Sequence, residues 1–266
     1  MKEIKKVKLF TNHNDQSKKA EQVTKEELLK HSFVLTEEND FDLGIAIGGD
    51  GSFLRMVNDS AFHKEALYVG INAGTLGFAQ DISTDEIKEF IEKLRNNDYY
   101  YEEIGIEDIK VESQEGIQEF QCLNEMVIRD IDLKTTHLNV YIEGVLLENF
   151  VGDGILISTS FGSTAYNLNY GGSIVYNEFD TLQLTPIAPI SSKTYRSLTN
   201  SLIIPYDKTI TIIPQETCNN LLITTDGRNN EFKEVTKIEI SIKNHIHLIR
   251  RNDYNYIRKI NDKFIK

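Results

Sequence analysis

The sequence predicts two structural parts, an α/β part with a parallel sheet followed by a β-rich, sandwich-like part. Strand-like and helix-like segments alternate through residues 1–100, which is the pattern of a parallel sheet with crossover helices. From Tyr99 onward, short apolar runs separated by turn residues such as Glu143-Gly144 dominate. The length of 266 residues suits one or two domains.

The first part is expected to contain three strands and three helices in alternation. The run 42–47 is apolar without alternation, which fits a strand buried on both faces. Ser83 and Glu86 form a capping-box pattern before a helix whose apolar residues recur at helical spacing. The other expected strands are 7–10 and 67–71, and the other helices are 18–30 and 52–62. Together they predict a Rossmann-like α/β domain over residues 1–100.

The second part, residues 101–251, is expected to be a sandwich-like domain of short strands. The predicted strands are 106–111, 120–127, 138–142, 155–158, 182–187, 202–204, 209–213, 221–225 and 237–242. Residues 252–266 predict a short closing helix that could pack on the first domain. Its inward residues would be Tyr256, Ile257, Ile260 and Phe264.

Charge and cysteine content exclude several classes of protein. The formal net charge of −12 disfavours binding to nucleic acid or to an anionic membrane, because both need basic surface. No stretch approaches the roughly 18 apolar residues of a membrane helix, and no signal segment is evident. Cys122 and Cys218 are the only cysteines and show no metal-ligand spacing. We therefore expect a cytoplasmic protein without a disulfide framework.

The stretch from Gly48 to Ser52 reads Gly-Gly-Asp-Gly-Ser and lies between a predicted buried strand and a predicted helix. Glycines allow a ligand to approach the backbone, and the free amides at a helix start suit phosphate. A carboxylate at Asp50 would be out of place beside phosphate unless it binds a metal or takes a proton from a hydroxyl nucleophile. The alternative interpretation is a simple tight turn, since Asp-Gly pairs are common in turns.

Two further groups of polar residues stand out. Residues 152–172 place Asp153 before an apolar strand and a Gly-Ser-Thr-Ala-Tyr run, Gly162 to Tyr166, after it. Small residues admit a ligand, hydroxyls supply hydrogen bonds, and Tyr166 could stack on a base. Asn124-Glu125 interrupts another apolar strand. Taken alone, the first group is better explained as a serine/threonine loop with a core tyrosine. The alternative interpretation of Asn124-Glu125 is a cross-strand or capping pair.

In this order and spacing, the three motifs resemble those of the NAD kinase family. The stretch Gly70 to Phe78 also resembles a family segment, and the resemblance spans residues 42–227. It implies transfer of the terminal phosphate of ATP to the 2′-hydroxyl of the adenosine ribose of NAD, which gives NADP. It also implies Mg²⁺ with ATP, and a homodimer or homotetramer with no nucleic-acid or membrane partner.

The resemblance assigns roles to individual residues. Asp50 would be the catalytic base, and Gly48, Gly49, Gly51 and Ser52 would hold the donor phosphates. Arg55 would add positive charge near them or, alternatively, be a surface charge of its helix. The remaining residues implied at the NAD site are Asp50, Gly51, Phe78, Asn124, Glu125, Asp153, Thr164, Ala165, Tyr166, Asn169 and Ala188.

This sequence also departs from the family pattern. Ser52 stands where the family usually has a threonine. Ser160-Phe161 stand where the family usually has a proline and a small hydroxyl residue, so the loop before the Gly-Ser-Thr-Ala-Tyr run is expected to be less preorganised. Two other functions remain open from the sequence. A lipid kinase of the diacylglycerol or sphingosine type would share the Gly-Gly-Asp-Gly element, and a non-catalytic dinucleotide sensor would bind NAD without turnover.

Overall fold

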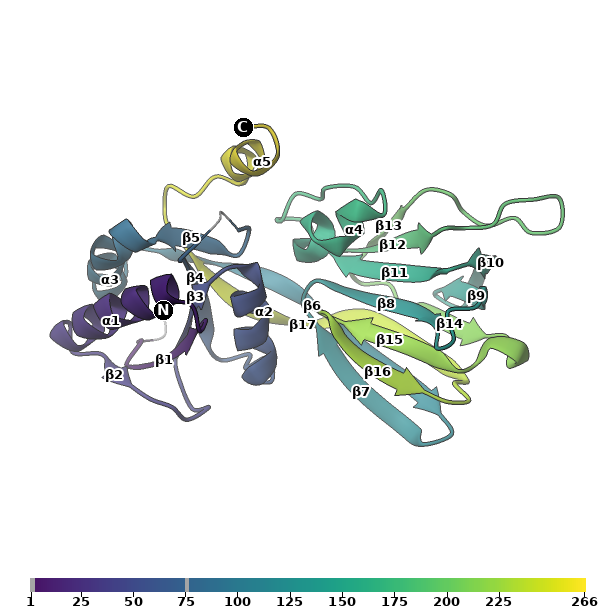
Figure 1. Ribbon diagram of the computed structural model, residues 1–266, viewed down its shortest axis with the longest axis horizontal. Coiled ribbons are helices and arrows are strands. Elements are labelled where there is room, and N and C mark those ends of the chain that lie inside the picture. The colour runs from purple at the N-terminus through teal and green to yellow at the C-terminus, as the bar shows by residue number, and fades with distance from the viewer. Residues whose placement is uncertain (1–2, 75–76) are drawn as a thin grey trace. The chain divides into compact units, whose positions relative to one another are not determined.

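A computed structural model describes residues 3–74 and 77–266 (Figure 1). The chain forms two compact units. The first unit contains residues 1–104 and 246–266, and the second unit contains residues 105–245.

The first unit is a parallel α/β sheet with helices, as expected. Its sheet order is β2-β1-β3-β4, all parallel, and β5 adds to β4 in parallel. The elements are β1 (Lys6–Thr11), α1 (Asp15–Lys30), β2 (Val34–Leu35), β3 (Leu43–Gly48), α2 (Asp50–Asp59), β4 (Leu67–Asn72), β5 (Gln80–Ser83), the 3-10 turn η1 (Thr84–Glu86), α3 (Ile87–Arg95) and α5 (Tyr256–Phe264).

The central strand β3 is buried along its whole length, which explains its unbroken apolar sequence. Gly48 pairs with Asn72 of β4, and Thr11 of β1 pairs with Ile47. The carboxyl ends of the three strands therefore share one edge of the sheet, which is where open α/β sheets bind ligands. The capping box of Ser83 and Glu86 is confirmed, with the Ser83 amide donating to Glu86 Oε2 at 2.9 Å.

The second unit is a sandwich of two antiparallel layers. One layer has the order β13-β12-β11-β8-β15-β16; the other contains β10-β9-β14-β17, with β6 paired to β17 and β7. The elements are β6 (Tyr100–Ser113), β7 (Gly116–Cys122), β8 (Glu125–Asp130), β9 (Thr136–Ile142), β10 (Val145–Gly152), β11 (Gly154–Thr159), η2 (Phe161–Thr164), α4 (Tyr166–Asn169), β12 (Thr181–Ile187), β13 (Leu202–Pro205), β14 (Ile210–Pro214), η3 (Glu216–Cys218), β15 (Leu221–Thr225), β16 (Arg228–Phe232) and β17 (Lys237–Arg250).

Alternate residues of both layers meet in one apolar core. Ile155 and Ile157 come from one layer, and Ile238 and Ile240 come from the other. This period of two is what places every second side chain of a strand on the buried face.

The units do not divide where the sequence suggested. The expected boundary at residue 251 lies just past the end of β17, but residues 246–250 of that strand already belong to the first unit. The physical reason is that β17 is one long strand whose last residues, including His247, pair in parallel with β4. The pattern of residues does not change inside a continuous strand, so the sequence could not show that the boundary between the units falls within β17.

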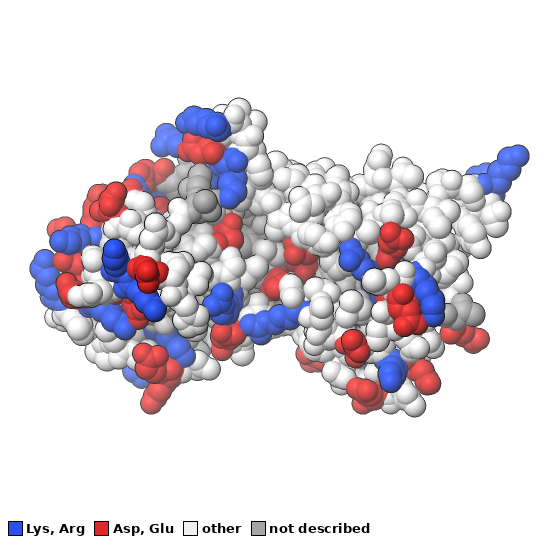
Figure 2. All heavy atoms as spheres, viewed as in Figure 1, with Lys and Arg blue, Asp and Glu red and all other residues white. Residues whose placement is uncertain are grey.

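Charged side chains of both signs are interspersed on the face shown in Figure 2. Over residues 3–74 and 77–266, no helix combines the length and apolar character needed to cross a membrane.

Candidate active site

The Gly-Gly-Asp-Gly stretch forms the turn from β3 into α2. Gly49 is the N-cap of α2, and Asp50 is its first residue. The helix continues because Phe53, Met56 and Val57 supply a buried apolar face. A Cβ on Gly48 would overlap the Ser52 hydroxyl, so the turn is closely packed against the first turn of the helix.

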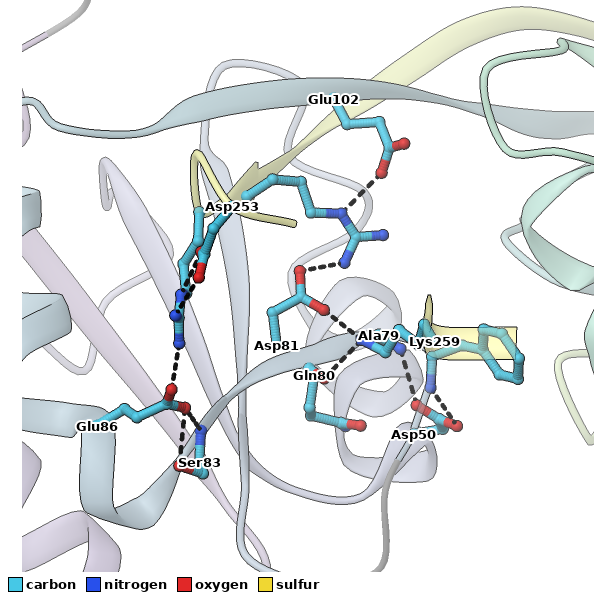
Figure 3. Close-up of polar contacts among 12 residues, drawn as sticks. Asp50, Ala79, Gln80, Asp81, Ser83, Glu86, Glu102, Asp253 and Lys259 are labelled. Atoms are coloured by element: carbon cyan, nitrogen blue, oxygen red, sulfur yellow. Dashed lines mark hydrogen bonds and ion pairs between the residues drawn. The ribbon is translucent and has the colours of Figure 1, made fainter. Parts of the chain in front are cut away.

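The Asp50 carboxylate is held by two backbone amides. The amide of Phe78 donates to Oδ2 at 3.1 Å, and the amide of Ala79 donates to Oδ1 at 2.9 Å (Figure 3). Asp50 is half-buried. Gly77 lies so close that a Cβ there would overlap Asp50 Oδ1, so the approach of this segment requires glycine. The carboxylate is therefore fixed in orientation and still accessible.

The start of α2 offers amides to an anion. Gly49 makes no side-chain cap, and the first amides of a helix have no partner within it. The exposed Gly51 lies in this first turn. Ser52 is 6% exposed and turned toward Gly48, so its side chain faces the interior. Arg55 is exposed on the same helix, which agrees with either interpretation of its charge.

In the second unit, Asp226 fixes the backbone around Asn124. Its carboxylate accepts the amides of Leu123 at 2.9 Å and of Asn124 at 2.8 Å, and the Cys122 thiol donates to it at 3.1 Å. Asp226 and Gly227 both have positive φ, 47° and 79°. The pair is thus the two-residue turn between β15 and β16, as its sequence indicates, and also an anchor for the Asn-Glu motif, which sequence reasoning missed.

The Asn-Glu motif and the Gly-Ser-Thr-Ala-Tyr motif lie against each other. A Cβ on Gly162 would overlap the backbone of Asn124, and the Thr159 amide donates to Asn124 O at 3.0 Å. The Tyr166 amide hydrogen-bonds to Glu125. Asn124 and Thr159, which lies shortly before the second motif, are 35 positions apart in the sequence. The two motifs nevertheless form one polar cluster.

Burial controls the charge of this cluster. Glu125 is 8% exposed, and burial together with the charge of Asp226 raises its pKa to about 7. Glu107 is fully buried beside these two carboxyls, and burial raises its pKa well above its usual range. Burial therefore favours the protonated forms of Glu125 and Glu107.

Tyr166 belongs to a small hydrogen-bonded group. Its hydroxyl lies 2.9 Å from that of Tyr170, and Arg129 Nη2 donates to Tyr170 at 2.8 Å. Hydrogen bonds with Tyr170 and Arg129 lower the pKa of Tyr166. The ring of Tyr166 is 38% exposed, so it is not the core tyrosine of the alternative interpretation. Sequence reasoning did not identify Arg129 or Tyr170.

The other predicted residues take varied positions. Asp153 is exposed between β10 and β11 and donates its amide to Ile187 O at 3.0 Å. Ala188, the residue after Ile187, is exposed and has a φ of 44°. Thr164 and Ala165 are half-buried and Asn169 is exposed. Within the stretch Gly70 to Phe78, Thr75 and Leu76 lie outside the described residues.

The departure at Ser160 has a structural counterpart. Its hydroxyl donates to Phe179 O and accepts the Thr181 amide at 3.0 Å. These bonds attach the loop to the start of β12, so hydrogen bonds tie the loop at the position where a proline is usual.

Resident metal ligands are not grouped in this structure. Among the described residues, no three histidine, cysteine, aspartate or glutamate side chains come together in a way that could hold a metal ion. A divalent cation that arrives with substrate phosphates needs no such cage, because Mg²⁺ keeps several waters and takes only one or two carboxylates.

These features define a class. A parallel α/β unit presents a carboxylate at a glycine-rich helix start, and the same chain carries a sandwich with a compact polar cluster. This combination is suited to a nucleotide-dependent phosphotransferase.

Comparison with known proteins names the family. Residues 1–99 match the family model of the ATP-NAD kinase N-terminal domain, and residues 123–249 match that of the ATP-NAD kinase C-terminal domain. The chain belongs to the NAD kinase family. This membership sets aside the lipid-kinase alternative.

Curated relatives and solved structures agree with this family assignment. An NAD kinase of Finegoldia magna is 35% identical, covering 97% of each chain, and one of Streptococcus gordonii is 33% identical, covering 98% of this chain and 96% of the relative. Yeast NADH kinase complexed with NADH has a TM-score of 0.85 at 19% identity, covering 99% of this chain and 88% of its own. An NAD kinase from Archaeoglobus fulgidus in complex with ATP has a TM-score of 0.75 at 19% identity, covering 96% and 98%. These two structures share the fold.

Proposed function

We propose that this protein phosphorylates NAD at the 2′-hydroxyl of its adenosine ribose, with ATP as donor, to give NADP. The observation that carries the proposal is the Asp50 carboxylate. It is half-buried at the start of α2 and is oriented by the amides of Phe78 and Ala79.

Asp50 acts as the base. As the ribose oxygen forms a bond to the terminal phosphorus of ATP, the bond from that phosphorus to the bridging oxygen of ADP breaks. The hydroxyl proton passes to the carboxylate and then to solvent. A positioned base of this kind contributes about 10²- to 10⁴-fold. Positioning and charge neutralisation supply the rest, because phosphoryl transfer needs little covalent help from the protein.

The donor phosphates bind at the backbone of Gly48, Gly49 and Gly51, where α2 offers amides and its positive dipole end. Ser52, the fourth residue implied there, supports the turn, because its amide donates to Gly49 O at 2.8 Å and its side chain is turned toward Gly48. Mg²⁺ bound to ATP would neutralise the charge on the phosphates. Arg55 would add positive charge near them.

The polar cluster of the second unit binds the dinucleotide. Asn124 and Glu125 provide hydrogen bonds, and the exposed ring of Tyr166 stacks on a ring of NAD. Phe78, Asp153, Thr164, Ala165, Asn169 and Ala188 complete the proposed NAD contacts. The partners are thus small molecules.

The decisive experiment incubates the purified protein with ATP, MgCl₂ and NAD and measures NADP with an NADP-specific dehydrogenase. NADP formation that depends on all three components supports the proposal. Binding of NAD without turnover would instead indicate a dinucleotide sensor. A parallel reaction with diacylglycerol vesicles should give no phosphorylated lipid.

Two further properties complete the proposal. We propose a homodimer or homotetramer in the cytoplasm, as the family resemblance implies. Sedimentation of the purified protein measures the first property, and fractionation of cells measures the second.

A further inference from the structure

The C-terminal helix α5 presents a buried lysine to the first unit. Tyr256 and Lys259 are its buried residues, and they are 6% and 7% exposed. Ile257 and Phe264, which the sequence placed inward, are 58% and 41% exposed. Burying an ammonium group is costly unless it is paired, so the contacts of Lys259 decide how the helix is docked.

Lys259 binds strand β5 directly beside the residues that hold Asp50. Its Nζ donates to Gln80 O at 2.7 Å and to the Asp81 carboxylate (Figure 3). Burial lowers the pKa of Lys259, while the charges of Asp81 and Asp50 oppose that effect. Lys259 thus lies within the electrostatic reach of the proposed base.

Asp81 is shared with a second buried cation. Arg250, 2% exposed, donates from Nη1 to the other Asp81 oxygen at 2.5 Å and from Nε to Glu102 at 2.8 Å. The Arg250 guanidinium also lies 4.1 Å from the centre of the Tyr254 ring. Two cations and two carboxylates therefore balance each other inside the first unit, and β5 is fixed at Asp81 from both sides.

The same helix holds the side chain of Phe78. The ring of Phe78 lies 6.2 Å from that of Tyr256 and 5.5 Å from that of Phe264, between ring centres. Helix α5 therefore contacts residues 78–81 at three points: the Phe78 ring, the Gln80 carbonyl and the Asp81 carboxylate. Their amides at Phe78 and Ala79 in turn hold Asp50.

We propose that Lys259 is a positioning residue for Asp50. By fixing Gln80 and Asp81, it keeps the amides of Phe78 and Ala79 aimed at the carboxylate, so that the base has one orientation. The kinetic part of this inference rests on the proposed function of Asp50; the structural part does not. Lys259 would act through these residues, since its ammonium group donates to Gln80 O and Asp81.

The kinetic test compares Lys259→Met with Arg258→Met, an exposed cation one position earlier on the same helix. For Lys259→Met we expect kcat to fall about 10- to 100-fold, because small displacements of a catalytic group are costly. The KM for NAD should change little. Arg258→Met should resemble the parent, and Lys259→Arg should recover part of the lost kcat because it keeps a cation at the site.

The structural test measures amide hydrogen exchange by NMR in the parent and in each folded variant. In the parent, the amides of Phe78 and Ala79 should be protected and should open together with those of α5. In Lys259→Met, their exchange should accelerate about tenfold or more, while amides of β3 stay protected.

The outcomes separate the two claims. If the parent forms no NADP, the proposed function is wrong, and the exchange data alone decide the structural claim. If the parent is active and Lys259→Met keeps its kcat, the inference is overturned. Fast exchange of Phe78 and Ala79 in the parent while α5 is protected would overturn it too, even if Lys259→Met does not fold.

Discussion

The carboxylate of Asp50 accepts a hydrogen bond from the amide of Ala79 at 2.9 Å, across 29 positions of the chain. A backbone donor has no side-chain rotamer to lose, so it orients an acceptor at low entropic cost. The orientation of the proposed base therefore depends on the path of residues 77–81, and only indirectly on their side chains.

Asp50→Asn tests the base. The amide side chain keeps one acceptor oxygen for the backbone amides but cannot accept the hydroxyl proton. We expect kcat to fall by at least about 10²-fold with NAD binding largely kept. Steady-state kinetics and calorimetric titration of NAD measure the two effects. Asp59→Asn, at the other end of α2, is the matched control. Turnover like that of the parent would remove Asp50 from the chemistry.

Tyr166→Ala tests the dinucleotide contact. Removing an exposed aromatic ring that stacks on a base should raise the KM for NAD about tenfold, which corresponds to about 1.4 kcal/mol. Tyr166→Phe keeps the ring and loses only the hydrogen bonds of the hydroxyl with Tyr170 and Arg129, so its KM should lie nearer that of the parent. An unchanged KM in the alanine variant would exclude Tyr166 from the NAD site.

Glu125 should make stability depend on pH. Its pKa is about 7 in the folded protein and about 4.5 in an unfolded chain, so the folded state favours the protonated form. The stability that this carboxyl contributes is fully present below about pH 4.5 and is lost as the pH rises through about 7. Glu125→Gln should reduce the fall in the free energy of unfolding between about pH 5 and pH 9 by about 1 to 3 kcal/mol.

Urea unfolding at the two pH values measures this effect. Glu231→Gln, an exposed position on β16, is the control and should keep the pH dependence of the parent. The raised pKa of the neighbouring Glu107 leaves a remaining pH dependence in every variant. If the free energy of unfolding falls equally in Glu125→Gln and in the parent between the two pH values, Glu125 is already ionised at the lower pH. Its pKa is then not raised in the folded protein.

Arg250→Met tests the buried charge network. The substitution leaves Asp81 and Glu102 without their shared guanidinium, and breaking a buried pair costs about 3 to 5 kcal/mol. Arg251→Met is the comparison, because Arg251 pairs with the more exposed Glu86 and Asp253 and should cost about 1 kcal/mol. Urea midpoints compare the two, and equal losses would contradict a special role for Arg250.

The sequence predicted what depends on neighbouring residues. The apolar run of β3, the glycine turn before α2 and the capping box at Ser83 are local patterns, and the structure contains each of them. The alternating residues that build the sandwich core also have a local period.

Contacts between distant residues could not be predicted in this way. Asp226 looked like an ordinary turn residue, yet it binds amides 102 and 103 positions away. No sequence feature singled out Lys259, yet it binds residues 178 and 179 positions away. The pairing of Lys259 with Asp81 also explains why the predicted inward face of α5 was only partly right: Tyr256 is buried, but the face turned inward includes Lys259 and leaves Ile257 exposed. No single-sequence pattern marks which lysine will find a buried carboxylate.

The second unit is continuous in the chain, whereas the first is assembled from residues 1–104 and 246–266. During synthesis, the sandwich can therefore complete its core while the α/β sheet still lacks part of β17 and all of α5. Because Lys259 follows the whole second unit in the chain, it can reach Asp81 only after the residues of the sandwich have been synthesised. A truncated or stalled product would contain a finished sandwich and the Gly-Gly-Asp-Gly turn, but no anchor for β5, so premature termination should yield protein that is assembled in its larger part and inactive.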